Sequence, residues 1–195
     1  MTIARFIVRA AVTAMAGVVI GHGVLYGAHR PSLSPMQSPV LTAAAVAQWV
    51  QQGARGTVIN AHGPMVTYHT RQVTLVALAS PVAIHRVGLF WEIDGLINPT
   101  IRVPLGATVH VVVINADRTH YHGFSVTAVR DARRNPRDVP MNPDAFIGMV
   151  APITPVGDQW AETTFHATRA GTFHYVCWLP GHAARGMIGT WEVTT

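Results

Sequence analysis

The segment FHYVCWLPGHAARGMIGTWEV, residues 173–193, decides the fold and contains the only cysteine of the 195-residue chain. It begins and ends with β-type runs, and the loop between them carries Cys177, His182 and Met187 at steps of five residues. In the first run, the two-residue alternation of a strand places Cys177 on the same face as the core-type Phe173. A thiol, an imidazole and a thioether are therefore expected to meet at one loop between two strands.

A second segment, THYHGFSVT (residues 119–127), supplies another imidazole. Phe124 and Val126 are core-type residues, and alternation puts His122 on their face near the start of the strand. His120 lies on the same face, so alternation alone does not separate the two histidines. The register set by Phe124 favours His122 as the inward donor.

The four side chains form a chemically particular set of donors. Two imidazoles and a thiolate in a trigonal arrangement, with a weak axial thioether, are the ligands of a blue-copper (type 1) electron-transfer site. A lone cysteine is commonly a small core residue, and a methionine at the start of a strand is more often core than ligand. Three of these donors lie on one loop and His122 supplies the fourth. Together they predict one type 1 copper ion, held by His122, Cys177, His182 and Met187.

Composition argues against several other classes. A single cysteine excludes an internal disulfide framework and a cysteine-rich zinc site, and methionine is a poor zinc ligand. The formal net charge of +5 is the balance of fourteen arginines, with no lysine, against nine carboxylates. Their one cluster, in RDARRNPRD (130–138), also carries two aspartates and no aromatic residue, which favours a solvated loop over a nucleic-acid interface.

The N-terminal section, residues 1–30, is expected to be a transmembrane anchor. Residues 10–28 carry no formal charge, and as a helix they would span about 28 Å, close to the hydrocarbon thickness of a bilayer. Arg5 and Arg9 precede them, so the positive-inside rule places the rest of the chain outside the cytoplasm. A cleaved signal peptide is the alternative, but Tyr26 stands where a small residue would be wanted before the cleavage site.

The remainder is expected to form a linker and one domain. Residues 31–39 are rich in proline and serine and predict a semi-extended spacer. Within the domain, residues 40–195, the pattern predicts a helix over 40–52 that Thr42 could cap. Residues 97–107 are expected to form an edge segment and a turn. Short β-rich runs without helical crossovers predict a β-sandwich or barrel; they lie at 73–79, 88–93, 107–115, 122–129, 160–167, 172–177 and 187–193.

These segments together resemble the cupredoxin family and, within it, the rusticyanin group. The copper loop 173–193 carries the resemblance most specifically, and residues 90–116, 122–127 and 167–177 extend it over most of the domain. The resemblance implies an all-β, cupredoxin-like Greek-key β-sandwich. Carried over residue by residue, it again gives the metal ligands as His122, Cys177, His182 and Met187.

The resemblance also implies a function: a one-electron carrier rather than an enzyme, with a cytochrome c and cytochrome c oxidase as respiratory partners. An anchored, acidophile cupredoxin that partners cytochrome c oxidase is the most similar type. This implies a place on the periplasmic side of the inner membrane, tethered by the N-terminal helix. A copper-handling accessory or assembly factor of the oxidase remains the alternative. A multicopper enzyme is disfavoured because only His120 and His122 form a His-x-His pair.

Two departures from the family pattern stand out. Gly123 follows the first expected ligand, where rusticyanin-like proteins carry a side chain that hydrogen-bonds within the site. Groups that hydrogen-bond to the ligands tune the properties of the metal, so the resemblance does not fix the reduction potential or the spectrum of the copper site. The expected anchor is the second departure, since rusticyanin is soluble.

Overall fold

The computed structural model describes residues 40–60, 63–81, 88–128, 142 and 144–195. The expected anchor (1–30), the linker (31–39) and the arginine cluster (130–138) lie outside these residues. Within the described part of the chain, no helix combines the length and apolarity that a membrane crossing requires.

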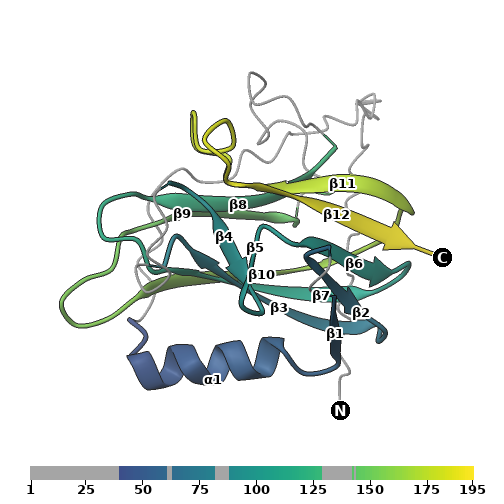
Figure 1. Cartoon of the computed structure of the whole chain (residues 1–195), viewed down its shortest axis with the longest axis horizontal. Helices are drawn as coiled ribbons and strands as arrows, with labels where there is room; N and C mark the ends of the chain where they lie inside the picture. Colours follow the sequence, from purple (N-terminus) through teal and green to yellow (C-terminus); the bar gives the residue numbers. More distant parts are fainter. Residues whose placement is uncertain (1–39, 61–62, 82–87, 129–141, 143) are drawn as a thin grey trace, which may run out of the picture.

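In the described part of the chain, two β-sheets pack face to face, and one helix covers the outside of one of them (Figure 1). The larger sheet has the strand order β1 (Thr57–Asn60), β2 (Met65–Tyr68), β6 (Thr100–Pro104), β12 (Ile188–Thr194), β11 (Gly171–Val176), β8 (His122–Thr127) and β9 (Phe146–Val150). The smaller sheet has the order β10 (Gln159–His166), β7 (Thr108–Asn115), β3 (Gln72–Ala79), β4 (Trp91–Ile93) and β5 (Leu96–Ile97). The expected all-β sandwich with a short helix is confirmed.

The helix α1 (Ala43–Gly53) explains why residues 111–114 of β7 are apolar without alternation. Val111 and Val113 of β7 face the core between the sheets, whereas Val112 and Ile114 face the other way and pack under α1. A strand buried on both faces needs apolar residues at every position rather than at alternate ones. The expected cap is also present, because Thr42 Oγ1 accepts a hydrogen bond from the Ala45 N–H at 3.3 Å.

Of the edge segment and turn expected over residues 97–107, the turn lies at 105–106 as expected, but the edge assignment is wrong for residues 100–104. Strand β6 is not an edge segment but lies inside the larger sheet, parallel to both β2 and β12. The two prolines of this segment lie at the ends of the strand: Pro99 precedes it and Pro104 is its last residue. Their missing N–H groups therefore leave the middle of the strand free to pair. Strands β1, β2 and β9 were not predicted at all.

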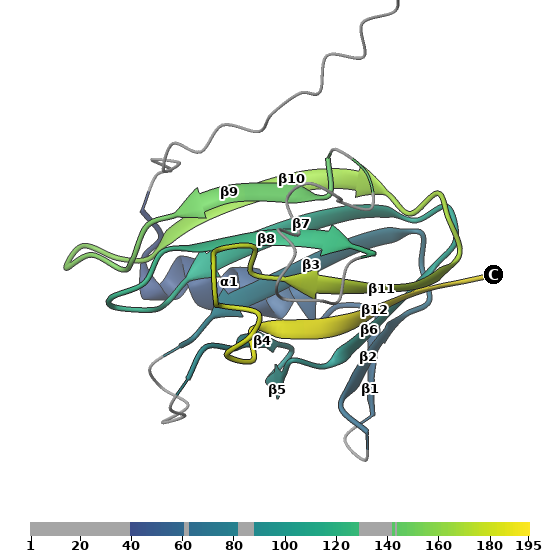
Figure 2. The same cartoon turned by 90° about the horizontal axis from the view of Figure 1, so that it is seen from above.

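The hairpin β11–β12 and the start of β8 come together at one end of the larger sheet. Strands β11 and β12 pair from Gly171 opposite Val193 to Val176 opposite Ile188. On its other side β11 pairs with β8, with Val176 opposite Ser125. Figure 2 shows β8, β11 and β12 side by side, with the loop that joins β11 to β12 curling over their ends. This neighbourhood holds the donors named from the sequence.

Candidate metal centre

Three of the four expected ligands meet in a buried cluster. His122 Nδ1, Cys177 Sγ and His182 Nδ1 lie close together, at 3.9 Å (His122 to Cys177) and 3.3 Å (His182 to Cys177). The donor atoms of the group all lie within 4.8 Å of one another. Around a first-row metal ion, bonds of about 2.0 and 2.3 Å at 120° would separate an imidazole nitrogen and a sulfur by roughly 3.7 Å. The two observed separations bracket that value, so the residues present fit a shared ion.

The backbone hydrogen bonds of the β11–β12 hairpin fix the position of the Cys177 thiol. Cys177 is the residue after β11, and its N–H donates to the Met187 carbonyl at 3.0 Å, which extends the β11–β12 pairing by one step. The side chain is fully buried and shares the core face with Phe173 and Tyr175. The inward direction expected from alternation is therefore observed.

Backbone hydrogen bonds fold the loop between β11 and β12 into compact turns, which place His182 beside the Cys177 thiol. The N–H of His182 donates to Leu179 O, and the N–H of Met187 donates to His182 O at 3.0 Å. Gly186 has φ +106°, a conformation that L side chains rarely adopt. Its carbonyl accepts a hydrogen bond from Asn98 Nδ2 at 2.8 Å, which ties the end of the loop to the turn after β5.

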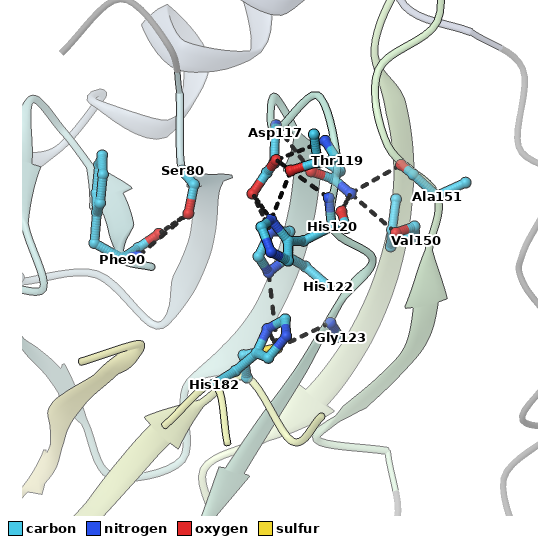
Figure 3. Close-up of polar contacts among 12 residues, drawn as sticks. Ser80, Phe90, Asp117, Thr119, His120, His122, Gly123, Val150, Ala151 and His182 are labelled. Carbon is cyan, nitrogen blue, oxygen red and sulfur yellow. Dashed lines mark hydrogen bonds and ion pairs between the residues drawn. The ribbon is translucent and has the colours of Figure 1, made fainter. Parts of the chain in front are cut away.

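The two rival histidines have different environments. The His122 side chain is fully buried, whereas the His120 side chain is 43% exposed. Only His122 belongs to the three-residue donor group. Figure 3 shows His122 between Asp117 and His182, with His120 beside it.

The fourth expected ligand lies at the same place in the fold. Met187 is fully buried, and its backbone bonds to both Cys177 and His182. Its thioether as the axial ligand remains a prediction.

Burial keeps the nitrogen donors unprotonated. Desolvation lowers the pKa of His122 to about 4, although the hydrogen bond that its ring donates to Asp117 acts in the opposite direction. The pKa of His182 is also lowered to about 4, first by desolvation and then by the neighbouring His122. Both rings are neutral at ordinary pH and offer a lone pair to a metal ion.

The pKa of the Cys177 thiol shifts in the direction that opposes metal binding. Desolvation raises the pKa of Cys177 to about 12, although the N–H groups of Gly123 and Leu179 favour the thiolate. The metal-free protein therefore holds a protonated thiol. A metal ion must displace that proton, because the thiolate is the ligand form.

Sequence reasoning missed the residues that support His122. Asp117 Oδ2 lies 3.1 Å from His122 Nε2, the nitrogen opposite the one that faces Cys177. Asn115 holds the same loop, since its amide donates to the carbonyls of His120, Val150 and Ala151. The one signal in the sequence is a pair of short polar residues, Asn115 and Asp117, where an apolar strand ends.

Gly123 has a structural explanation. The β8–β9 register shifts between His122 and Phe124, and the Gly123 N–H donates to Cys177 Sγ at 3.4 Å. A Cβ at this position would lie 2.2 Å from Nε1 of Trp178. The indole of Trp178 thus fills the space that a side chain at residue 123 would need.

Comparison with known proteins matches this fold and site. The chain is 35% identical over 139 residues to rusticyanin of Acidithiobacillus ferrooxidans, an alignment that covers 66% of this chain and 81% of that protein. The chain belongs to the rusticyanin family of cupredoxins. A 1.27 Å structure of rusticyanin from Thiobacillus ferrooxidans superposes with a TM-score of 0.70 at 30% identity, over 84% of this chain and all of that one. The recognition of a rusticyanin-like cupredoxin from the copper loop is confirmed.

Two further similarities place this rusticyanin-like chain among copper proteins. A family model described as multicopper oxidase matches residues 92–195. The copper-resistant cuproprotein CopI of Rubrivivax gelatinosus is 28% identical over 90 residues, covering 46% of this chain and 54% of that protein.

Proposed function

We propose that this protein is a type 1 copper electron-transfer protein that carries one electron at a time. The observation that supports this most directly is the buried cluster of His122, Cys177 and His182, with donor atoms within 4.8 Å of one another. Two imidazoles and one thiolate are the equatorial ligands of such sites. Membership of the rusticyanin family points the same way.

The remaining ligand in this proposal is Met187, as the weak axial donor. When bound, copper supplies a one-electron couple between Cu(II) and Cu(I). The protein contributes a donor set acceptable to both oxidation states, since the sulfur ligands are soft and the imidazoles are intermediate. Because the donors already lie together without the metal, little rearrangement of the chain is needed between the two states.

The surface near His182 suits a transient partner. Leu179 and Ala183 are half-buried, Pro180 and Ala184 are exposed, and all four flank His182 in the loop. Trp178, the residue after Cys177, does not belong to this face, because it is buried and stacks on Phe146. A small apolar face fits the brief, weak encounters typical of redox partners.

A cytochrome c and a terminal cytochrome c oxidase are the partners that we propose. The domain would lie on the periplasmic side of the inner membrane, anchored by residues 1–30. Support comes from the uncharged run 10–28 and the two arginines before it. Anchoring would confine encounters to the membrane plane and raise the effective concentration of the partners.

A carrier is favoured over an enzyme. Within the described part of the chain, one group of three or more metal-binding side chains is close enough to share an ion. The chemistry of multicopper oxidases needs several copper ions. A copper-handling accessory is the second candidate, favoured by the similarity to CopI. Full burial of Cys177 opposes easy release of Cu(I), so repeated redox cycling without metal loss separates the two.

The spectrum of the copper-loaded protein tests the proposal. With one equivalent of Cu(II), we expect an intense visible thiolate-to-copper band and the small copper hyperfine splitting of a type 1 site in EPR. Cys177→Ser should remove the band. A wild-type protein that stays colourless and redox-silent with Cu(II) would refute the proposed function.

Single substitutions test the ligand assignment. His122→Ala should lose the type 1 spectrum, whereas His120→Ala should keep it. Met187→Leu should keep the visible band but change the reduction potential, because the axial ligand tunes it. Retained colour in His122→Ala, or an unchanged potential in Met187→Leu, would overturn the respective assignment.

A further inference from the structure

The two nitrogens of the His122 ring face different groups. Nδ1 points to Cys177 Sγ at 3.9 Å, and Nε2 lies 3.1 Å from Oδ2 of Asp117 (Figure 3). An ionised carboxylate only accepts hydrogen bonds. The contact therefore requires the proton on Nε2, which leaves the lone pair of Nδ1 directed toward the donor cluster.

Asp117 is itself held firmly. Its other oxygen, Oδ1, accepts hydrogen bonds from the N–H of Thr119 at 2.8 Å, from the Thr119 hydroxyl at 3.1 Å and from the N–H of His120 at 3.2 Å. Its backbone N–H donates to Asn115 Oδ1 at 3.0 Å.

The two oxygens of Asp117 have separate roles. Oδ1 closes the turn before β8, a role that many loop aspartates fill. Oδ2 is not needed for that turn, yet it is directed at the buried ring of His122 and at Nδ1 of the half-exposed His120, both at 3.1 Å. A residue that served only the turn would have no reason to turn its second oxygen inward.

We propose that Asp117 is a positioning residue for the metal centre, which fixes His122 as an Nδ1 donor and lowers the reduction potential through its negative charge. The inference rests on the proposed copper function. Carboxylate partners of ligand histidines fix the tautomer and raise the basicity of the ring. A negative charge next to a ligand favours the more highly charged Cu(II) over Cu(I), so the potential falls.

Asp117→Asn is a sharp probe because it is not a neutral replacement here. Three donors converge on the Oδ1 position, so the amide oxygen of an asparagine must occupy it. The NH₂ group then takes the Oδ2 position and faces Nε2–H of His122, donor against donor. The ring must change tautomer or move, and the negative charge is lost at the same time.

The first measurement uses the metal-free protein and needs no copper. Long-range proton–nitrogen NMR of ¹⁵N-histidine-labelled protein at neutral pH should give the Nε2–H tautomer for His122. In Asp117→Asn, the Nδ1–H form should appear. An Nδ1–H tautomer in the wild type would overturn the proposal without any variant, even if Asp117→Asn failed to fold.

The second measurement is the reduction potential of the copper-loaded protein. We expect Asp117→Asn to favour Cu(I) by about tenfold, a rise of about 59 mV for a one-electron couple. Asp144→Asn is the matched control, because Asp144 is exposed and precedes β9 at the end away from Val150, the residue opposite His122. It makes the same change of charge far from the ligands.

The outcomes separate this inference from the proposed function. A wild type without a type 1 spectrum refutes the copper function. A wild type with that spectrum, whose potential rises no more in Asp117→Asn than in Asp144→Asn, refutes the role of Asp117 alone. A larger rise in Asp117→Asn supports that role.

Discussion

Gly123, next to the ligand His122, has no room for a side chain, because a Cβ there would lie 2.2 Å from Nε1 of Trp178. Its missing Cβ leaves room for the indole of Trp178, which donates from Nε1 to Ile147 O at 2.8 Å and stacks on Phe146 with ring centroids 5.4 Å apart. The absent side chain therefore does not leave a void beside the thiol. The space is filled by the residue that follows Cys177.

Gly123→Ser should destabilise the metal-free protein by about 1–3 kcal/mol, because a well-packed interior accepts extra atoms only with strain. Urea denaturation measures the change. Gly63→Ser is the control, since a Cβ at Gly63 meets no atom within 4 Å. The cost should shrink in the double variant Gly123→Ser/Trp178→Ala, in which the clash is absent. Equal effects at residues 63 and 123 would contradict this account.

Among the secondary-structure elements, the helix and the metal centre occupy opposite sides of the molecule. Helix α1 packs on the outer face of the smaller sheet through Val46, Trp49 and Val50. The donors belong to β8 and to the β11–β12 hairpin of the larger sheet. The core between the sheets separates the two (Figure 1).

Trp49→Ala should therefore lower stability without changing the metal centre. Trp49 contacts Trp160 and His110 with ring centroids about 6 Å apart, and its loss should cost about 1–3 kcal/mol, less than for a fully buried tryptophan. Thermal unfolding measures the cost, and the visible spectrum should stay unchanged. Gln51→Ala, at an exposed helix position, should change neither. An altered copper spectrum in Trp49→Ala would show that the helix and the site are coupled.

For the molecule as a whole, the metal-free state should be sensitive to mild acid. The pKa of His122 is lowered from 6.5 to about 4 in the fold by desolvation, so between these values the unfolded chain binds a proton that the folded chain does not. Stability should therefore fall as pH drops from 6.5 to 4, by on the order of 1 to 3 kcal/mol. The lowered pKa of Asp117 acts in a separate window, because its contribution is lost only as pH falls from 3.8 towards 2.

Denaturation curves at pH 7, 5.5 and 4 would measure this loss. The copper-loaded protein is the control, because a bound ion occupies the nitrogen that a proton would take and stabilises the folded state by mass action. Its stability should change less over the same range. Equal pH dependence with and without copper would contradict the prediction.

The sequence predicts where individual strands lie better than it predicts which strands pair. The runs that form β3, β7, β10, β11 and β12 were predicted within one or two residues, because alternation and β-branched residues are local signals. Strands β1 and β2 were missed because they are short and give a weak pattern. The expectation that β6 would lie at an edge was wrong because the whole sheet decides which strands pair, and the residues of β6 alone do not reveal this.

The sequence by itself determined the chemistry: one thiol, two imidazoles and a thioether in an apolar, β-rich domain, since ligand type and strand alternation are properties of short segments. Only the tertiary structure decided which histidine faces the thiol, that Asp117 supports it, and that Trp178 takes the space beside Gly123. Those facts depend on side chains far apart in the chain, such as residues 122 and 177, which become neighbours only when β8 and β11 pair. Local sequence patterns contain no information about such contacts between distant segments.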